Sequence, residues 1–256
     1  MTDPRDRAAE PASFHQHRFV PPPDATELVL VRHGQSAAYV DGQPFPLVAG
    51  QGDPPLSELG AEQARRVCAR LSAEDSASPG GPPRDPPVQS IAGPGDAREP
   101  AVPHISAIYV TTLRRTAQTA APLARQLGLD CQVEAGLREV HLGDWEGGLY
   151  RKMVAAGHPA YRQAAAEERW DAIPGAEPAA EFAARVRDAI TRLAAAHPGQ
   201  RIAAFTHGGV IGQVLALAAG SRPFAFIGAD NASISRIVIT GDLWIVRGFN
   251  DTAHLD

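Results

Sequence analysis

The chain has 256 residues, 44% of them hydrophobic, and a formal net charge of -5. This length allows one globular domain with a substantial core and is short for two ordinary domains. The negative balance argues against nucleic acid and anionic membranes as partners. The two cysteines, Cys68 and Cys131, lie far apart and form no C-x-x-C pair, so a redox or metal role for them has little support.

The chain start lacks an apolar stretch of signal-peptide length, and no later run approaches the length of a membrane span. These features predict a cytoplasmic protein. Residues 1–26 are polar and rich in proline, which predicts a flexible arm before a single domain over residues 27–256.

The first part of the domain begins with a buried strand, "LVLV", at residues 28–31. The segment "LSELGAEQARRVCARL" at 56–71 predicts an amphipathic helix capped by Ser57, with a buried face formed by Ala61, Ala64, Cys68 and Leu71. Residues 72–104 are dominated by proline, glycine and charge. They predict a surface insertion without regular structure.

The second part alternates strands and helices. We expect strands at 105–110, 131–135 and 201–206, helices at 111–128, 178–196 and 210–220, and a final hairpin of 233–239 and 243–248. The segment 149–178 is predicted to be helical and irregular and to cap a pocket. This alternation predicts a three-layer α/β/α sandwich with a mainly parallel central sheet.

Polar residues follow three of these strands at the point where each strand ends. They are Arg32-His33-Gly34, Arg114-Arg115 and His207-Gly208-Gly209. In parallel sheets a ligand binds beyond the carboxyl ends of the strands, so these groups should converge on one face.

Two guanidiniums and two imidazoles repel a metal cation and suit a phosphate, whose oxygens match the arginine fork. A histidine among arginines can attack phosphorus if its other ring nitrogen donates to a carbonyl and leaves the attacking nitrogen unprotonated. A leaving alkoxide needs a proton, and Glu139 on the loop "GLREVHLGDWEG" can supply it. Turnover of esters with poor leaving groups should therefore rise toward mildly acidic pH.

The sequence resembles the histidine phosphatase superfamily, also called phosphoglycerate mutase-like, from Leu28 almost to the C-terminus. The resemblance rests on "RHG" at Arg32-His33-Gly34 and on "LSELGAEQA", "TTLRRTAQTA", "LREVHLGDWEG" and "FTHGGVI", which occur in the family's order. It implies the phosphoglycerate mutase-like fold.

The resemblance also implies roles. His33 would be the phosphorylated nucleophile, Glu139 the general acid and base, and Arg32, Arg115 and His207 the phosphoryl clamp. Further phosphate or substrate contacts would come from Gln35, Ser36, Tyr39 and Gly208. Arg114 is interpreted as a helix-surface residue. No cofactor and no metal are implied.

The sequence departs from the family pattern at two places. Many members carry asparagine at the position of Tyr39, and the insertion 72–104 has no counterpart in compact relatives. The first departure affects the outer phosphate contact and the pocket shape. The second should lie at the end of the sheet away from the site.

A phosphatase acting on a phosphorylated small molecule, or on a phosphoprotein, is the favoured function. The alternative within the family is a phosphoglycerate-type mutase, which is disfavoured because no extra basic cluster is evident near the site loops. A non-catalytic phospho-ligand binding module is a third possibility. A homodimer through the strand 243–248 stays open, as does coverage of that strand by the chain's own arm.

Other readings of single residues compete with these. "GQSAA" approaches a serine-hydrolase elbow with Ser36 as nucleophile and His207 or His254 as base, although the final glycine is replaced by Ala38. A metal site using His141 and Asp144 lacks known ligand spacing. Trp145 and Trp170 can line the pocket or only pack, and Glu177 can start a helix.

Overall fold

The computed structural model describes residues 16, 19–76 and 104–256. Its central sheet has six strands in the order β5-β4-β6-β1-β7-β8. The strands are β1 (Thr26–Arg32), β4 (Ile105–Val110), β5 (Cys131–Val133), β6 (Arg201–Thr206), β7 (Ile234–Thr240) and β8 (Leu243–Asp251). The strands β5, β4, β6 and β1 run parallel, and β7 and β8 add an antiparallel edge. The predicted fold class is confirmed.

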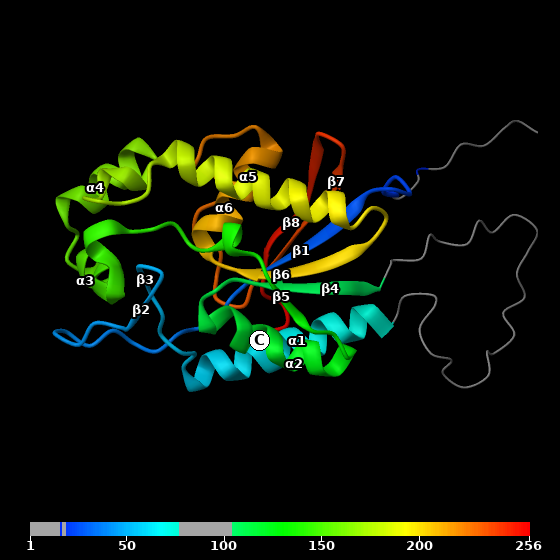
Figure 1. Cartoon of the computed structure of the whole chain (residues 1–256), viewed down its shortest axis with the longest axis horizontal. Coiled ribbons are helices and arrows are strands. Elements are labelled where there is room, and N and C mark those ends of the chain that lie inside the picture. Colours follow the sequence, from blue (N-terminus) through cyan, green and yellow to red (C-terminus); the bar gives the residue numbers. More distant parts are fainter. Residues whose placement is uncertain (1–15, 17–18, 77–103) are drawn as a thin grey trace, which may run out of the picture.

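Helices cover both faces of this sheet, as Figure 1 shows: α5 (Ala179–Ala196) and α6 (Gly208–Ala219) lie above the strands, and α1 (Glu58–Ser76) and α2 (Arg114–Leu127) lie below. Alternate strand residues point to opposite faces, so Leu28 and Leu30 pack toward α5 and α6, while Val29 and Val31 pack toward α1 and α2. The result is a core on each face of one sheet.

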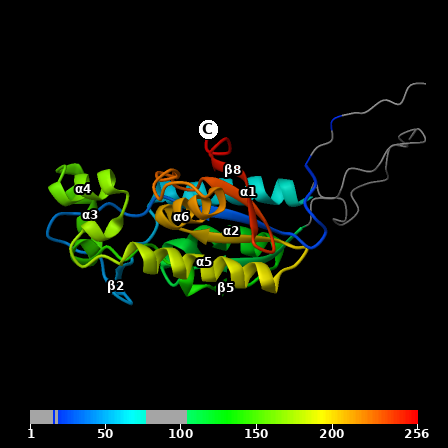
Figure 2. The same cartoon turned by 90° about the horizontal axis from the view of Figure 1, so that it is seen from above.

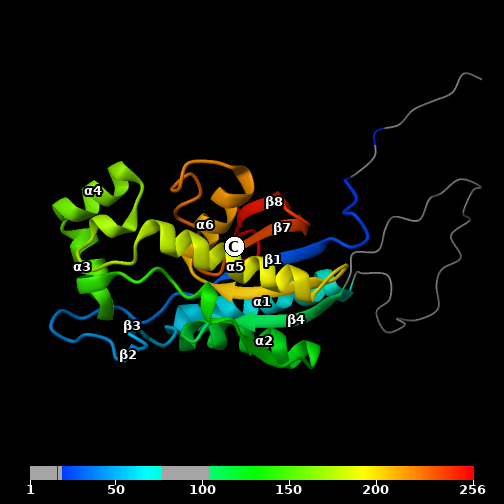
Figure 3. The same cartoon turned by 45° about the horizontal axis from the view of Figure 1, so that its top comes forward.

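The smaller elements gather beyond one end of the sheet. They comprise α3 (Leu149–Ala155), α4 (Pro159–Glu167), the short strands β2 (Leu47–Val48) and β3 (Gln51–Gly52), and the 3-10 helices η1 (Ala135–Leu137), η2 (Gly143–Gly148) and η3 (Trp170–Ala172). Figures 2 and 3 show α3 and α4 standing together beyond the sheet in both views. These helices have a separate apolar cluster around Trp145, Ala164 and Ile173.

The first helix differs from its predicted bounds at its C-terminal end. Ser57 caps it as expected, because its Oγ accepts from Gly60 N at 3.1 Å. The helix continues to Ser76, so residues 72–76 do not belong to an unstructured insertion. Its fully buried residues are Gly60, Ala64, Val67 and Leu71, and Ala61 and Cys68 are only partly buried. The polar residues after Leu71 did not indicate a helix, but Glu74 in this last part of α1 pairs with Arg201 and Arg236 of the sheet.

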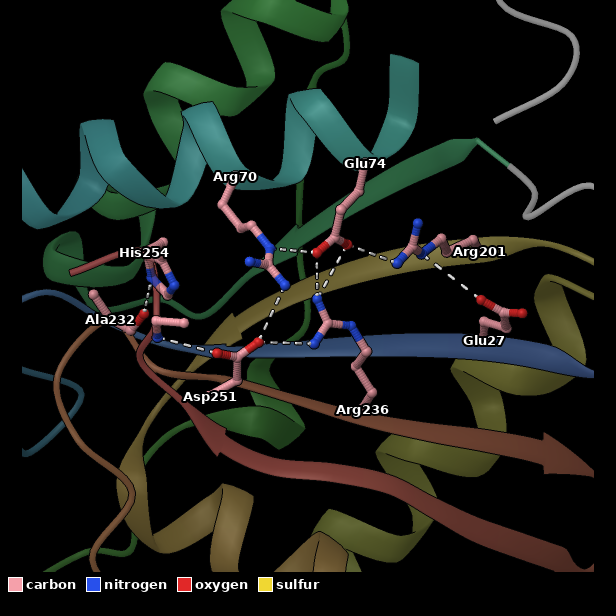
Figure 4. A network of polar contacts seen from close by, with 9 residues as sticks. Glu27, Arg70, Glu74, Arg201, Ala232, Arg236, Asp251 and His254 are labelled. Carbon is pink, nitrogen blue, oxygen red and sulfur yellow. Dashed lines mark hydrogen bonds and ion pairs between the residues drawn. The ribbon is translucent and has the colours of Figure 1, made fainter. Parts of the chain in front are cut away.

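An ion-pair network fastens the C-terminal half of α1 to the sheet (Figure 4). Glu74 pairs with Arg70 at 2.6 Å, with Arg201 of β6 at 3.1 Å and with Arg236 of β7 at 2.8 Å. Arg201 is buried, and Glu27 of β1 lies 3.7 Å from it. Because α1 extends into residues predicted to be loop, Glu74 can join this helix directly to β6 and β7, and Arg201 extends the network to Glu27 of β1.

The described part of the chain contains no helix long and apolar enough to cross a membrane. The strand β8 forms one edge of the sheet, and Arg247 on it stacks over the ring of Phe19 at 4.2 Å. Residues 1–15, 17–18 and 77–103, which include most of the predicted arm and insertion, lie outside the described residues. The homodimer stays a prediction.

Candidate active site

The ends of β1 and β6 bring two histidines together. Arg32 and Thr206 are paired in the parallel ladder, so the residues that follow them, His33 and His207, leave the sheet side by side. Their ring centroids are 5.2 Å apart with an interplanar angle of 63°. Strand register therefore creates the histidine pair predicted from the sequence.

The ring of His33 is prepared for nucleophilic attack. Its Nδ1 lies 2.8 Å from the carbonyl oxygen of Gly34, and because a carbonyl only accepts, Nδ1 carries the proton. Burial, followed by the charges of Arg115 and Arg32, holds the pKa of His33 well below its usual 6.5. At neutral pH the ring is uncharged, and Nε2 keeps its lone pair.

The backbone after His33 is locked against the start of α1 by two glycines. A Cβ on Gly60 would lie 2.0 Å from the carbonyl oxygen of Gln35, and one on Gly34 would lie 2.5 Å from the carbonyl oxygen of Gly60. Both distances are impossible for real side chains. The side chain of Ser57 also donates to Gln35 Oε1 at 2.9 Å. The turn that holds the nucleophile therefore rests directly on helix backbone.

Arg32 and Arg115 line a cavity beside His33. Arg32 donates to the carbonyl of Ala229, and its buried Nε has no partner in the part of the chain described. Arg115 donates to the carbonyl of Gly52 at 3.0 Å. Burial, opposed by Glu139, lowers the pKa of Arg115 to about 10 and lowers that of Arg32. Both stay charged at neutral pH, so they can receive an anion.

Glu139 faces the start of α6 within the same cavity. Its Oε2 accepts from Gly209 N at 3.2 Å, and its Oε1 accepts from Val140 N at 3.1 Å. Its backbone carbonyl accepts from Gln51 Nε2 at 2.6 Å and from Arg185 at 2.9 Å. These bonds fix the acid loop from both its side chain and its backbone.

Arg185 of α5 supports that loop and was missed by the sequence analysis. It also donates to the carbonyls of Gly136 and Arg138, at 2.9 and 2.8 Å. Glu177 pairs with Arg185 at 2.6 Å and accepts from His141 N at 3.2 Å. The interpretation of Glu177 as a simple helix start is therefore incomplete, because its carboxylate joins α5 to the acid loop.

His207 lies behind His33 and is fully buried. Its Nε2 is 3.0 Å from Thr111 Oγ1, and its buried Nδ1 has no partner in the described structure. Burial, then the charge of Arg115, holds its pKa well below the usual value. His207 does not line the cavity as Arg32, Arg115 and Glu139 do, so its clamp role stays a prediction.

A segment between α6 and β7 braces the nucleophile from the other side. Asn231 Nδ2 donates to the carbonyl of His33 at 3.0 Å, and Ala232 N donates to the carbonyls of Arg32 and His33 at 3.1 and 3.2 Å. Ala232 has φ of 62°, a value rare for residues other than glycine. No local sequence pattern marks these residues, because their partners lie some 200 positions away.

The cavity has a volume of about 1390 Å³ and includes the other predicted contact residues, Gln35, Ser36, Tyr39 and Gly208. It extends from the strand ends to α3 and α4, as expected for residues 149–178. Trp145 and Trp170 both line it. Tyr150 lies between them, with ring centroids 6.3 Å from each, and burial raises its pKa to about 12. Aromatic side chains therefore form part of the cavity wall.

Arg151 of α3 lines the same cavity and was also missed. It donates to Ser36 Oγ at 2.7 Å, and among the described residues neither candidate base bonds that hydroxyl, since His207 Nε2 contacts Thr111 Oγ1. His254 instead contacts the carbonyl of Ala232 at 3.0 Å. The serine-hydrolase alternative is therefore not supported.

The metal alternative is not supported by the placement of its residues either. His141 Nδ1 accepts from Gly143 N at 3.1 Å, and the ring lies outside the cavity lining. Among the described residues, no group of three or more His, Cys, Asp or Glu side chains is placed to hold a metal ion. Arg114 pairs with Asp53 at 2.9 Å and is half-exposed, as a surface residue should be.

The family model of the histidine phosphatase superfamily (branch 1) matches residues 28–78 and 98–252. The chain belongs to this superfamily. A metal-independent phosphoserine phosphatase of Arabidopsis thaliana is 29% identical over 236 residues, which cover 91% of this chain and 84% of that protein. A mycobacterial glucosyl-3-phosphoglycerate phosphatase structure is 28% identical, with a TM-score of 0.64 over 88% of this chain and 98% of its own.

The superfamily also contains mutases that resemble this chain. A probable phosphoglycerate mutase of Yersinia enterocolitica is 26% identical over 237 residues, which cover 90% of this chain and 95% of that protein. The predicted family and its phosphoglycerate mutase-like fold are confirmed, and both phosphatases and mutases are among the relatives.

Proposed function

We propose that the protein is a metal-independent phosphomonoesterase that forms a phosphohistidine on His33. The observation that carries the proposal is the hydrogen bond from His33 Nδ1 to the carbonyl of Gly34, on a ring that is neutral beside two charged guanidiniums. This combination provides a nucleophilic nitrogen and a binding site for a phosphoryl group.

In the first half-reaction, His33 Nε2 attacks phosphorus while the bond from phosphorus to the ester oxygen breaks. Arg32 and Arg115 stabilise the charge on the non-bridging oxygens, and His207 contributes through Nδ1, the ring atom without a partner. The leaving oxygen takes a proton from the acid form of Glu139. The products are phosphohistidine, the free alcohol and the Glu139 carboxylate.

In the second half-reaction, water attacks the phosphohistidine. The Glu139 carboxylate accepts a proton from that water, and the bond from phosphorus to Nε2 breaks. Inorganic phosphate leaves, and His33 and protonated Glu139 are regenerated. A mutase would instead return the phosphoryl group to a second hydroxyl of the substrate, and the family contains such enzymes.

The substrate is proposed to be a phosphorylated small molecule. Support comes from the relatives, which include phosphatases named for phosphoserine and for glucosyl-3-phosphoglycerate. The location in the cytoplasm and the homodimer are predictions from the sequence.

Phosphate release from a panel of phosphomonoesters in the presence of EDTA tests the proposal. The native protein should release phosphate, and His33→Ala should release none. The control His104→Ala changes a distant histidine that pairs with Asp75, and its rate of phosphate release should match that of the native protein. When the native protein is denatured during turnover of an ester radiolabelled in its phosphate, acid-labile label should stay bound to the protein. No label should stay bound to His33→Ala. Activity that persists in His33→Ala contradicts the proposal, and label transferred only between substrate hydroxyls indicates a mutase.

A further inference from the structure

A third guanidinium projects into the cavity from α3, outside the set that handles the phosphoryl group. Arg151 donates through one terminal nitrogen to Ser36 Oγ at 2.7 Å and through the other to the carbonyl of Ala37 at 2.6 Å. The ring of Phe45 lies 5.5 Å from the guanidinium carbon. These contacts hold Arg151 in one orientation beside the turn that carries the nucleophile.

The charge of Arg151 is not neutralised by the described parts of the protein. No described carboxylate lies within 4 Å of it, although its neighbour Lys152 pairs with Asp41 at 2.7 Å. The nearby Glu146 carboxylate accepts from the backbone of Gly52 and Leu142, both within 2.9 Å. Burial, then the charge of Arg32, lowers the pKa of Arg151. Arg151, which has no carboxylate partner among the described residues, therefore shares one cavity with Arg32 and Arg115.

Arg151 also has N–H groups beyond those used in its bonds to Ser36 and Ala37. A guanidinium has five N–H groups, and the two bonds to Ser36 and Ala37 use one hydrogen on each terminal nitrogen. Three N–H groups are left, including Nε–H. A planar donor set of this kind matches the paired oxygens of a carboxylate or phosphate.

We propose that Arg151 binds a second oxyanion, a carboxylate or phosphate, on the leaving-group side of the substrate. The inference rests on the proposed function and specifies its substrate class as phosphomonoesters whose alcohol carries another negative group. Arg32 comes from the end of β1 and Arg115 from the first turn of α2, and both meet the transferred phosphoryl group. Arg151 comes from α3 and meets the remainder of the molecule. A substrate with a neutral leaving group would offer no anion to the Arg151 guanidinium.

The test uses esters that differ in one group. O-phosphoserine is compared with phosphoethanolamine, 3-phosphoglycerate with glycerol 3-phosphate, and fructose 1,6-bisphosphate with fructose 6-phosphate. The native enzyme should prefer the first member of at least one pair, and that pair identifies carboxylate or phosphate as the group bound. Arg151→Gln should lower kcat/KM for that member roughly 10- to 100-fold, mainly through KM, and leave its partner within about threefold.

Two variants provide matched controls. Lys152→Gln removes the same charge from the same helix at a cation that already has a carboxylate partner, and it should preserve the preference. Arg151→Lys keeps the positive charge but lacks the planar donor set of a guanidinium, so it should retain part of the preference that Arg151→Gln loses. Equal losses on both members of every pair would mean that Arg151 only fixes Ser36, and the proposal would be wrong.

Binding to His33→Ala separates this inference from the proposed chemistry. Calorimetric titration of that inactive variant with each pair measures the preference without turnover. Loss of the preference in the double variant His33→Ala/Arg151→Gln supports the subsite even if the protein proves to be a mutase or a binding module. Equal affinity for both members of each pair in His33→Ala would overturn it.

Discussion

Gly209 is in direct contact with Glu139: its N–H donates to Oε2 at 3.2 Å, and a Cβ built on it would lie 2.5 Å from Oε1. The absence of a side chain at Gly209 therefore sets the position of the carboxyl group. Gly209→Ala should displace the acid and lower kcat for alkyl phosphates roughly 10- to 100-fold, as expected for general acid catalysis. Steady-state kinetics on one alkyl ester measures the effect.

The neighbouring glycine provides the comparison for that substitution. A Cβ on Gly208 would lie 3.3 Å from Arg32 Nε, a contact that a shift of a few tenths of an ångström relieves. Gly208→Ala should cost less activity than Gly209→Ala. The reverse order would show that the acid does not depend on this close approach.

Arg185 should act as a positioning residue for the acid loop. Arg185→Lys removes the fork that holds three carbonyls and Glu177, so kcat should fall about tenfold with KM nearly unchanged. Arg192→Lys, an exposed change on the same helix, is the control. A rise in KM alone would point to substrate contact and contradict this role.

The pH dependence of the rate should differ between good and poor leaving groups. Because the pKa of His33 lies well below 6.5, the nucleophile stays unprotonated as pH falls from 8 to about 6. Hydrolysis of 4-nitrophenyl phosphate should be nearly flat over that range. Alkyl esters, which need the acid form of Glu139, should turn over faster toward mildly acidic pH. A rate for alkyl esters that climbs steadily into alkaline pH would exclude Glu139 as the acid.

Stability should fall as the solution becomes acidic. His33 and His207 have folded-state pKa values well below the value of about 6.5 in the unfolded chain, so below that pH the unfolded state binds protons that the folded state does not. Each histidine then costs about 1.4 kcal/mol of unfolding free energy per pH unit, down to its lowered folded pKa. Urea unfolding of His207→Gln between pH 7 and 5 should show a shallower slope than the native protein. An unchanged slope would contradict a neutral, buried His207.

The ion pairs of Figure 4 should affect stability without affecting chemistry. Glu74→Gln leaves the buried guanidinium of Arg201 without its nearest carboxylate, at a cost of roughly 3 kcal/mol. Glu62→Gln on the same helix breaks exposed pairs and should change stability much less than Glu74→Gln. Chemical unfolding measures both, and kcat of the folded protein should be unchanged.

Much of the architecture could be predicted because its signals are local. Phe182, Val186, Ile190 and Leu193 recur at helical spacing within the predicted helix 178–196, and all four are buried in α5. Gly128 ends α2 in the left-handed conformation that favours glycine. The order of strand ends then predicted which residues meet, and Arg32, His33, Arg115 and Glu139 do line one cavity.

The missed residues act through contacts between distant segments. Arg185 supports the carbonyl of Glu139 from 46 positions away, and Arg151 reaches Ser36 from 115 positions away. The periodic spacing of apolar residues that marks a buried helix face does not predict either of these arginine contacts. The sequence analysis did not single out Arg151, because it becomes a neighbour of the site only when α3 folds over the strand ends.

The separate apolar cluster of Trp145, Ala164 and Ile173 has an evolutionary consequence. The helices α3 and α4 are stabilised by their own small core, whereas the turn that carries the nucleophile is locked against the start of α1 through Gly34 and Gly60. Apart from Arg151, which bonds Ser36 and Ala37 of the nucleophile turn, substitutions on those two helices should therefore disturb the bond-breaking machinery less than substitutions at Gly34 or Gly60. A fold divided in this way can acquire new substrates by replacing one module, and grafting residues 149–172 from a relative offers a direct route to redesigning its preference.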